Sequence, residues 1–268
     1  MKTGVITVLA VWLLAACSSK EGKVTVRENF NTSESSASFT KGDREYTMDF
    51  EGIEVSTGID AEVFRSEVEK VILEGDSEVL DKVEVKVEKG RLHIRFASGV
   101  NRVRRDRVKA RIYARDIVFI EANSAADIVL KDKFVQEKMS VRASSAGEIE
   151  GALEANDLSI QASSSGVYKG DVWAVNLSVS TSSSGEVSLQ GKAKNSQMEA
   201  SSSGEIQSKN LVTEKALLQA SSSGSIAVSV SGEAKASASS SGSVKVGRTQ
   251  PNVPVQRDES SGGEVKIR

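Results

Sequence analysis

The chain has 268 residues, a formal net charge of -2 and 27% charged side chains, a balance that excludes the strongly basic surface typical of nucleic-acid-binding proteins. Its one histidine and one cysteine exclude an intramolecular disulfide, a multi-cysteine zinc site and a histidine-rich metal cluster. The composition therefore predicts no metal, no cofactor and no nucleic-acid partner.

Residues 1–16 are typical of a signal peptide. A lysine at position 2 precedes an apolar stretch over residues 5–14, which is long enough for a signal peptide but too short to span a bilayer. The stretch ends in Leu14-Ala15-Ala16-Cys17, which resembles the lipobox of bacterial lipoproteins. We expect Cys17 to be the lipid attachment site; the alternative is a conventional signal peptide that is cut elsewhere.

Lipid on Cys17 would anchor the protein in the bacterial cell envelope. The outer membrane is the favoured site, and both a periplasmic and a surface-exposed orientation remain open. Residues 17–41 are rich in Ser, Thr, Glu, Asn and Lys, a composition that predicts a flexible tether between the membrane and a folded domain.

Residues 42–118 predict a β region without a strict repeat. Alternating apolar residues predict strands, and Lys89-Gly90 predicts a turn. His93 alternates with Leu92 and Ile94, so we expect it to face solvent rather than to bind a ligand. The expected strands cover residues 53–55, 61–64, 71–73, 83–87 and 92–96.

A basic run follows these strands. It comprises Arg102, Arg104, Arg105, Arg107, Lys109 and Arg111. These side chains could contact an anionic partner, for which nucleic acid is disfavoured because only one aromatic residue is interleaved with them. The favoured interpretation is structural: charge on the solvent-exposed face of an edge strand protects that strand from aggregation.

Residues 119–268 contain a repeat. Blocks of alternating residues end in small residues and a glycine, and successive glycines are 18 to 21 residues apart. A period near 19 with alternation on both sides predicts an all-β fold, a β-solenoid (β-helix) with one coil of about 19 residues per repeat. The repeat-turn glycines are Gly147, Gly166, Gly185, Gly204, Gly224, Gly242 and Gly263.

The serines before each glycine have two interpretations. They could form a ligand array of hydroxyl groups along one edge of the rod. The favoured interpretation is structural: small side chains fit a tight corner, their hydroxyls bond to the turn backbone, and the glycine supplies a positive φ. Both prolines lie in residues 249–255, which predicts that the chain end caps the solenoid.

The order of motifs resembles the bacterial envelope family described as "putative auto-transporter adhesin, head GIN domain". The resemblance rests on residues 50–55, 58–63, 71–76, 83–94 and 108–113, followed by residues 117–128 and the Ser-Ser-Gly coils. It implies a right-handed parallel β-solenoid and an adhesin-like role. No active residue is established for that family, so none is carried over.

Three functions remain. The first is a non-enzymatic, lipid-anchored envelope protein that binds a glycan or another envelope protein, with an undetermined oligomeric state. The second is a structural or stress-response accessory lipoprotein of the envelope. The third is a polysaccharide-active β-helix enzyme, which is disfavoured because coils of about 19 residues leave no long loops to wall a cleft.

Overall fold

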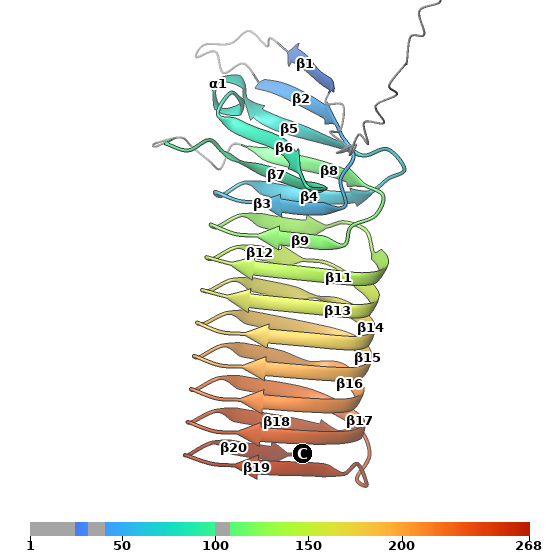
Figure 1. The fold of residues 1–268 in the computed structure, drawn as a ribbon, viewed down its shortest axis with the longest axis vertical. Coiled ribbons are helices and arrows are strands. Elements are labelled where there is room, and N and C mark those ends of the chain that lie inside the picture. Colours follow the sequence, from blue (N-terminus) through green and yellow to red (C-terminus); the bar gives the residue numbers. More distant parts are fainter. Residues whose placement is uncertain (1–24, 32–40, 100–107) are drawn as a thin grey trace, which may run out of the picture.

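The protein is an elongated stack of β coils (Figure 1). The computed structural model describes residues 25–31, 41–99 and 108–268. It is nearly all-β, with 68% strand and 2% helix. About eight turns with coils of about 19 residues form a β-solenoid, which confirms the predicted fold class. Parallel strands in neighbouring coils hydrogen-bond along the rod, so each coil satisfies the backbone of the next.

The elements of the N-terminal half include one short helix. No helix in the described part of the chain is long and apolar enough to cross a membrane. These elements are β1 (Thr25–Asn31), β2 (Lys41–Thr47), β3 (Gly52–Val55), β4 (Asp60–Arg65), β5 (Lys70–Asp76), α1 (Ser77–Leu80), β6 (Val83–Glu88), β7 (Arg91–Phe96) and β8 (Lys109–Ala114).

The strands of the C-terminal half are β9 (Phe119–Ala122), β10 (Asp127–Leu130), β11 (Phe134–Ser144), β12 (Glu148–Glu150), β13 (Leu153–Ser163), β14 (Val167–Thr181), β15 (Glu186–Ala200), β16 (Glu205–Ala220), β17 (Ser225–Ala238), β18 (Ser243–Arg248), β19 (Val255–Glu259) and β20 (Glu264–Ile267). The longest of them are β14 to β17, in the middle of the solenoid.

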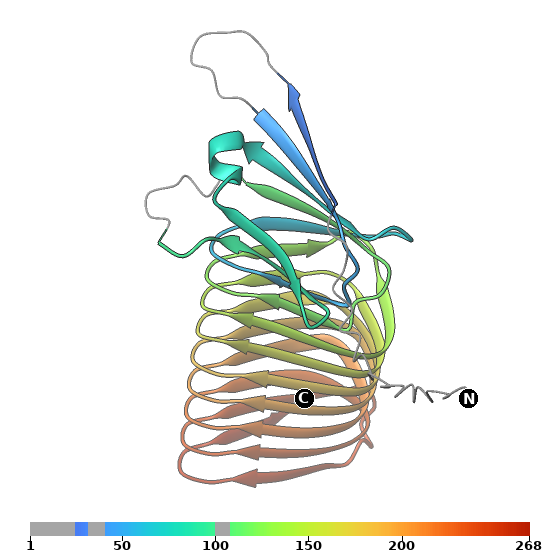
Figure 2. The same cartoon turned by 45° about the horizontal axis from the view of Figure 1, so that its top comes forward.

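Coil stacking begins upstream of residue 119. Strand β3 pairs in parallel with both β7 and β9, and β4 pairs in parallel with both β8 and β10. The coil formed by β3 and β4 therefore lies between β7 and β8 on one side and β9 and β10 on the other. Antiparallel strands β5, β2 and β1 continue the sheet beyond this point, at the end opposite β19 and β20 (Figure 2).

Part of the expected tether is a strand. Residues 25–31 form β1, which pairs antiparallel with β2 from Thr25 opposite Thr47 to Asn31 opposite Lys41. A sequence of mixed polarity becomes a strand here because the free edge of β2 offers backbone hydrogen bonds to it. The tether interpretation is therefore wrong for these residues, while residues 17–24 and 32–40 lie outside the described part.

The core consists of inward-facing side chains that stack on their equivalents one coil away. The 19-residue register places Ile149 beside Tyr168 and Tyr168 beside Val187. Burial of such side chains contributes about 25 cal/mol per Å² of apolar surface. One stack continues from Ile128 to the last strand and comprises Ile128, Ile149, Tyr168, Val187, Ile206, Ile226, Val244 and Val265.

The tight turns correct the expected role of the glycines. In the turn Ser163–Gly166 the left-handed residues are Ser164 (φ 50°) and Ser165 (φ 62°), and the Gly166 amide donates to the Ser163 carbonyl at 2.8 Å. This is the pattern of a type I′ turn. None of the seven repeat-turn glycines has a left-handed φ. The expectation that they supply positive φ is therefore wrong.

Each repeat-turn glycine is required instead by a close backbone approach. A Cβ on Gly166 would lie 2.2 Å from the carbonyl oxygen of Ala143 in the preceding coil, and a Cβ on Gly185 would lie 2.3 Å from that of Ala162. The other five repeat-turn glycines are equally crowded, with a backbone atom of the preceding coil within 2.3 to 2.7 Å of a Cβ. Stacking, rather than turn geometry, therefore fixes glycine at this position.

The chain end forms the last coil. The residue 249–254 loop buries Val253, and the Pro254 carbonyl accepts a hydrogen bond from the Ala234 amide at 3.0 Å. Strands β19 and β20 then stack in parallel on β17 and β18. Among the described residues no further strand pairs with their outer edges, and that edge carries charged residues that oppose strand addition.

Candidate functional site

The solenoid carries a long groove on one of its outer faces. Its volume is about 1320 Å³, and its lining comes from equivalent positions of successive coils from β11 to β19. Six coil spacings of about 4.8 Å give it a length of roughly 30 Å. A groove of this shape fits an elongated ligand that lies parallel to the solenoid axis.

Three adjacent rows of residues form the groove. The first row faces outward and comprises Lys138, Asp157, Asn176, Asn195, Lys215 and Glu233. The floor row comprises Met139, Leu158, Leu177, Ser196, Ala216 and Ala234, all of them buried. The second row faces outward and comprises Ser140, Ser159, Ser178, Gln197, Leu217, Lys235 and Gln256.

Side-chain amides in the first row hydrogen-bond along the axis. Asn195 Nδ2 donates to Asn176 Oδ1 at 2.9 Å, and Asn176 Nδ2 donates to Asp157 Oδ1 at 2.8 Å. Hydrogen bonds in such a chain polarise one another, and this chain ends on a carboxylate. Each amide keeps a second N–H and further acceptor capacity for a ligand.

Charges in the groove are paired near its two ends. Lys138 Nζ lies 3.8 Å from Asp157 Oδ2, and Lys215 Nζ lies 3.0 Å from Glu233 Oε1. Between them, the lining from β14 and β15 is uncharged. Leu217 is exposed to 39% and adds an apolar side chain to the second row.

The basic residues predicted from the sequence are not part of this groove. Arg102, Arg104, Arg105 and Arg107 lie outside the described residues. Lys109 and Arg111 lie on β8, which pairs on one side with β4 and on the other with β5. Their strand is therefore internal to the sheet, and the edge-strand interpretation is wrong for these two residues.

Acidic neighbours accompany these two cations. Arg111 Nη1 lies 2.6 Å from Glu74 Oε1 on β5. Hydrogen bonding from Lys131 lowers the pKa of the Glu62 carboxyl, and the charges of Arg111 and Lys109 lower it further. The described part of the basic run is thus matched by carboxylates of adjacent strands.

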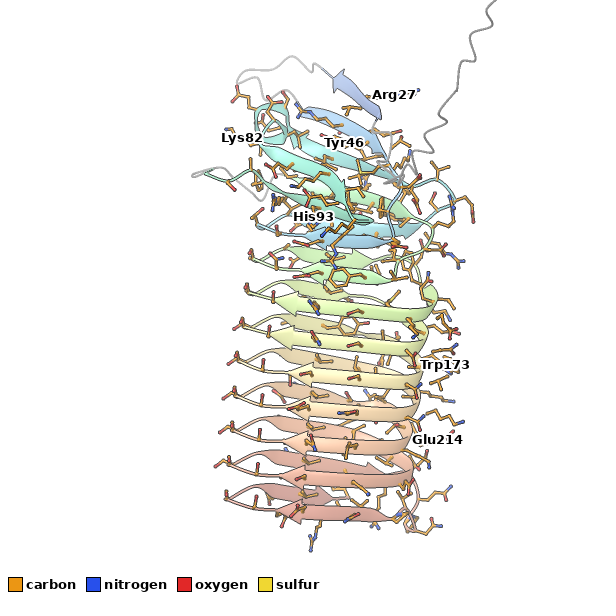
Figure 3. All side chains as sticks on the ribbon, viewed as in Figure 1. Arg27, Tyr46, Lys82, His93, Trp173 and Glu214 are labelled. Atoms are coloured by element: carbon orange, nitrogen blue, oxygen red, sulfur yellow. The ribbon has the colours of Figure 1, made fainter. Side chains whose placement is uncertain are left out.

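The predicted lipid site, Cys17, also lies outside the described residues. His93 faces outward, as expected, but its side chain is only 16% exposed, and its Nδ1 lies 3.2 Å from Glu54 Oε2 on β3. Trp173 is 48% exposed and projects from the bend opposite the tight turns, outside the groove lining (Figure 3).

The turn serines do not use their hydroxyls as expected. Among the described residues, no hydroxyl of a Ser-Ser-Ser-Gly turn makes a hydrogen bond within the protein, so the expected bonds from these hydroxyls to the turn backbone are absent. Backbone groups stabilise the turns instead: the Ser165 amide donates to the Ser183 carbonyl at 3.1 Å, and equivalent bonds continue along the edge.

Three carboxylates stack at the start of the coils. Asp127 is in register with Asp60 on one side and Glu148 on the other. Burial raises the pKa of the Asp127 carboxyl, and the charges of Asp60 and Glu148 raise it further. No group of three or more metal-ligating side chains within ranges 25–31, 41–99 and 108–268 is arranged to hold a metal ion.

Replacing Asp127 by asparagine should raise the melting temperature at pH 7 by a few degrees. The raised pKa means that the folded state binds the Asp127 proton more tightly than the unfolded state, so the ionised carboxylate destabilises the fold at neutral pH. As pH falls through the raised pKa, Asp127 becomes protonated and this destabilisation is removed. The melting-temperature advantage of D127N over the unmodified protein should therefore shrink in acid. Melting curves at pH 7 and pH 4 check this; a D127N advantage that is absent at pH 7 contradicts it.

The groove was not predicted from the sequence because the residue type in its outward-facing rows changes from coil to coil. Asp157, Asn176, Asn195 and Lys215 are structurally equivalent but chemically different. The available signal was positional: the residue 19 places after Asp157 is Asn176, and the next is Asn195.

The chain resembles solved structures over almost its whole length. A "putative adhesin" from Parabacteroides distasonis has a TM-score of 0.76 at 16% identity, with 92% of this chain and 98% of that chain covered. A "putative adhesin" from Parabacteroides merdae has a TM-score of 0.72 at 15% identity, with 92% and 97% covered. These likenesses show a shared fold.

A third structure shares the fold under a different description. It is a "putative lipid binding protein" from Parabacteroides distasonis, with a TM-score of 0.71 at 17% identity and with 85% of this chain and 96% of that chain covered. A search of curated protein sequences finds no significant match.

A family model matches residues 49–171 and 168–248, which is more than half of the chain. The matched region contains β3 to β18 and most of the groove lining. The chain therefore belongs to the family described as "putative auto-transporter adhesin, head GIN domain".

Proposed function

We propose that this protein is a non-enzymatic, lipid-anchored binding protein of the bacterial envelope, and that its groove holds an elongated partner. The continuity of the groove over successive coils carries the proposal, because a rigid solenoid presents the same three rows to each segment of a ligand. The family description supports an adhesin-like role at the envelope.

The chemistry of the groove supports binding rather than catalysis. Acid and base catalysis requires titratable groups that converge on one reacting atom. Here four of the charged lining residues form ion pairs, and the Glu137 carboxylate accepts a hydrogen bond from Asn156 Nδ2 at 2.6 Å. The floor consists of buried aliphatic and small side chains, none of which is titratable.

Filling the groove with a larger side chain should weaken binding of the partner. Ser178 and Ser180 both face outward on β14, but only Ser178 lines the groove. Ser178→Tyr should lower affinity at least tenfold, whereas Ser180→Tyr should leave it within twofold. The full-length chain and both variants are assayed on immobilised polysaccharides, peptidoglycan fragments and outer-membrane proteins. Equal effects of the two substitutions, or a partner whose affinity neither variant changes, would contradict the proposal.

The lipid anchor rests on the sequence around Cys17. A single acyl chain gives marginal membrane binding, whereas two signals give stable anchoring. Cys17→Ala should therefore abolish incorporation of labelled palmitate and move the protein from the membrane fraction to the soluble fraction. Ser18→Ala is the matched control and should leave both unchanged. A Cys17→Ala protein that still carries label and remains with membranes contradicts the anchor.

A further inference from the structure

We infer that the ligand of the groove is a neutral, linear polysaccharide that lies along the solenoid axis. This inference rests on the proposed binding function of the groove and names its ligand class.

The balance of charge excludes a polyanion. The groove lining contains three acidic residues and three basic residues, so its formal charge is zero. The acidic members are Glu137, Asp157 and Glu233, and the basic members are Lys138, Lys215 and Lys235. A polymer with charge on every unit would require an excess of opposite charge along the whole path. The uncharged centre on β14 and β15 offers none.

The hydrogen-bonding groups match hydroxyls. Asn176 and Asn195 each use one amide hydrogen within the first row, which leaves a donor and an acceptor site on each side chain. Ser159, Ser178 and Gln197 face them across the floor. Sugar hydroxyls both donate and accept, so they can satisfy these groups at each coil.

An acyl chain fits the same groups poorly. It would cover Asn176 and Asn195 without replacing their bonds to water, and each polar group left unpaired costs about 1–3 kcal/mol. The exposed apolar side chain of the lining, Leu217, is a single contact that suits the C–H face of one sugar ring rather than a continuous acyl chain. Rows of polar side chains with one exposed apolar contact thus favour an amphipathic ring polymer over a lipid tail.

The sheet geometry disfavours an extended peptide. A peptide strand gains affinity by pairing its backbone with a free sheet edge. The groove lies on the face of the solenoid, where the backbone of β13, β14 and β15 is already paired with adjacent coils. A peptide placed here would lack that main source of affinity.

Binding of hexasaccharides to the full-length chain tests the inference. The probes are cellohexaose, xylohexaose and mannohexaose, with polygalacturonate, a fatty acid and an unstructured peptide as competitors of other classes. At least one neutral hexasaccharide should bind, with an affinity that changes less than twofold between low and high salt. The double variant Asn176→Ala/Asn195→Ala should weaken it about tenfold, through loss of two ligand hydrogen bonds.

The matched control removes two exposed amides elsewhere on the solenoid. Gln190→Ala/Gln207→Ala lies at the small depression on another face and should bind normally. Failure of every neutral hexasaccharide, or equal losses in the two double variants, overturns the inference. Binding of polygalacturonate, lipid or peptide without any neutral hexasaccharide also overturns the inference. If Ser178→Tyr blocks binding of that other ligand, the proposed binding function of the groove survives. If Ser178→Tyr does not block it, the proposed function of the groove fails as well.

Discussion

Gly166→Ala should destabilise the protein by about 3 kcal/mol or more, an unusually large effect for one added methyl group. The new Cβ would lie 2.2 Å from the Ala143 carbonyl oxygen and 2.3 Å from its carbon, and these atoms belong to the backbone of the adjacent coil. The two coils would have to move apart to relieve this steric clash, and that movement would weaken the backbone hydrogen bonds between them. The urea midpoint of unfolding measures the loss.

The matched control lies one residue upstream. Ser165 has a φ of 62°, so Ser165→Gly removes the steric cost of a left-handed residue while it adds entropy to the unfolded chain. These effects oppose each other, and stability should change by less than about 1 kcal/mol. Comparable losses at both positions would show that turn conformation, rather than coil contact, selects glycine at position 166.

Tyr168→Ala should be the most damaging truncation in the repeat region, with a loss of about 3–5 kcal/mol. Tyr168 is fully buried in a stack whose neighbours are Ile149 and Val187, and it is the largest side chain there. Gly170 leaves room for its hydroxyl, because a Cβ there would lie 2.8 Å from the phenol oxygen. That hydroxyl donates a hydrogen bond to the Gly151 carbonyl at 3.1 Å.

Tyr168→Phe separates packing from hydrogen bonding. It preserves the ring but removes the donor to the Gly151 carbonyl, so it should cost about 1 kcal/mol. Burial of the phenol raises the pKa of Tyr168 well above its usual range, so the native hydroxyl stays protonated and donates. Thermal and urea unfolding of both variants measure the difference; a Tyr168→Phe loss as large as that of Tyr168→Ala would contradict the packing explanation.

The sequence predicts the regular coils because they depend on local patterns. Inward residues alternate, and the glycines recur at a spacing that matches the observed register from Gly147 to Gly263. Even the irregular steps have a structural counterpart: glycine steps of 20 and then 18 residues accompany register shifts at Ser188/Gln190 and Ser208/Val212. Residues 209–211 have no pairing partner in the next coil.

Long-range relationships were not predictable in the same way. The β3–β4 coil contains no Ser-Ser-Ser-Gly turn, and it stacks between β7–β8 and β9–β10, an order that differs from the chain order. Alternation identifies each of these strands but does not select its neighbours. The groove was hidden for a related reason, since it depends on the side-by-side placement of positions whose residue types differ.

Hydroxyl-radical footprinting tests the binding role of the groove most directly. Leu217, exposed to 39%, lies in the groove, whereas Trp173 and Val135, each exposed to 48%, lie outside its lining. The full-length chain is oxidised with and without a saturating concentration of the tightest-binding hexasaccharide. Bound sugar should reduce oxidation of Leu217 several-fold and leave Trp173 and Val135 unchanged. Protection of Trp173 or Val135 with Leu217 still fully oxidised would contradict the groove as the binding site.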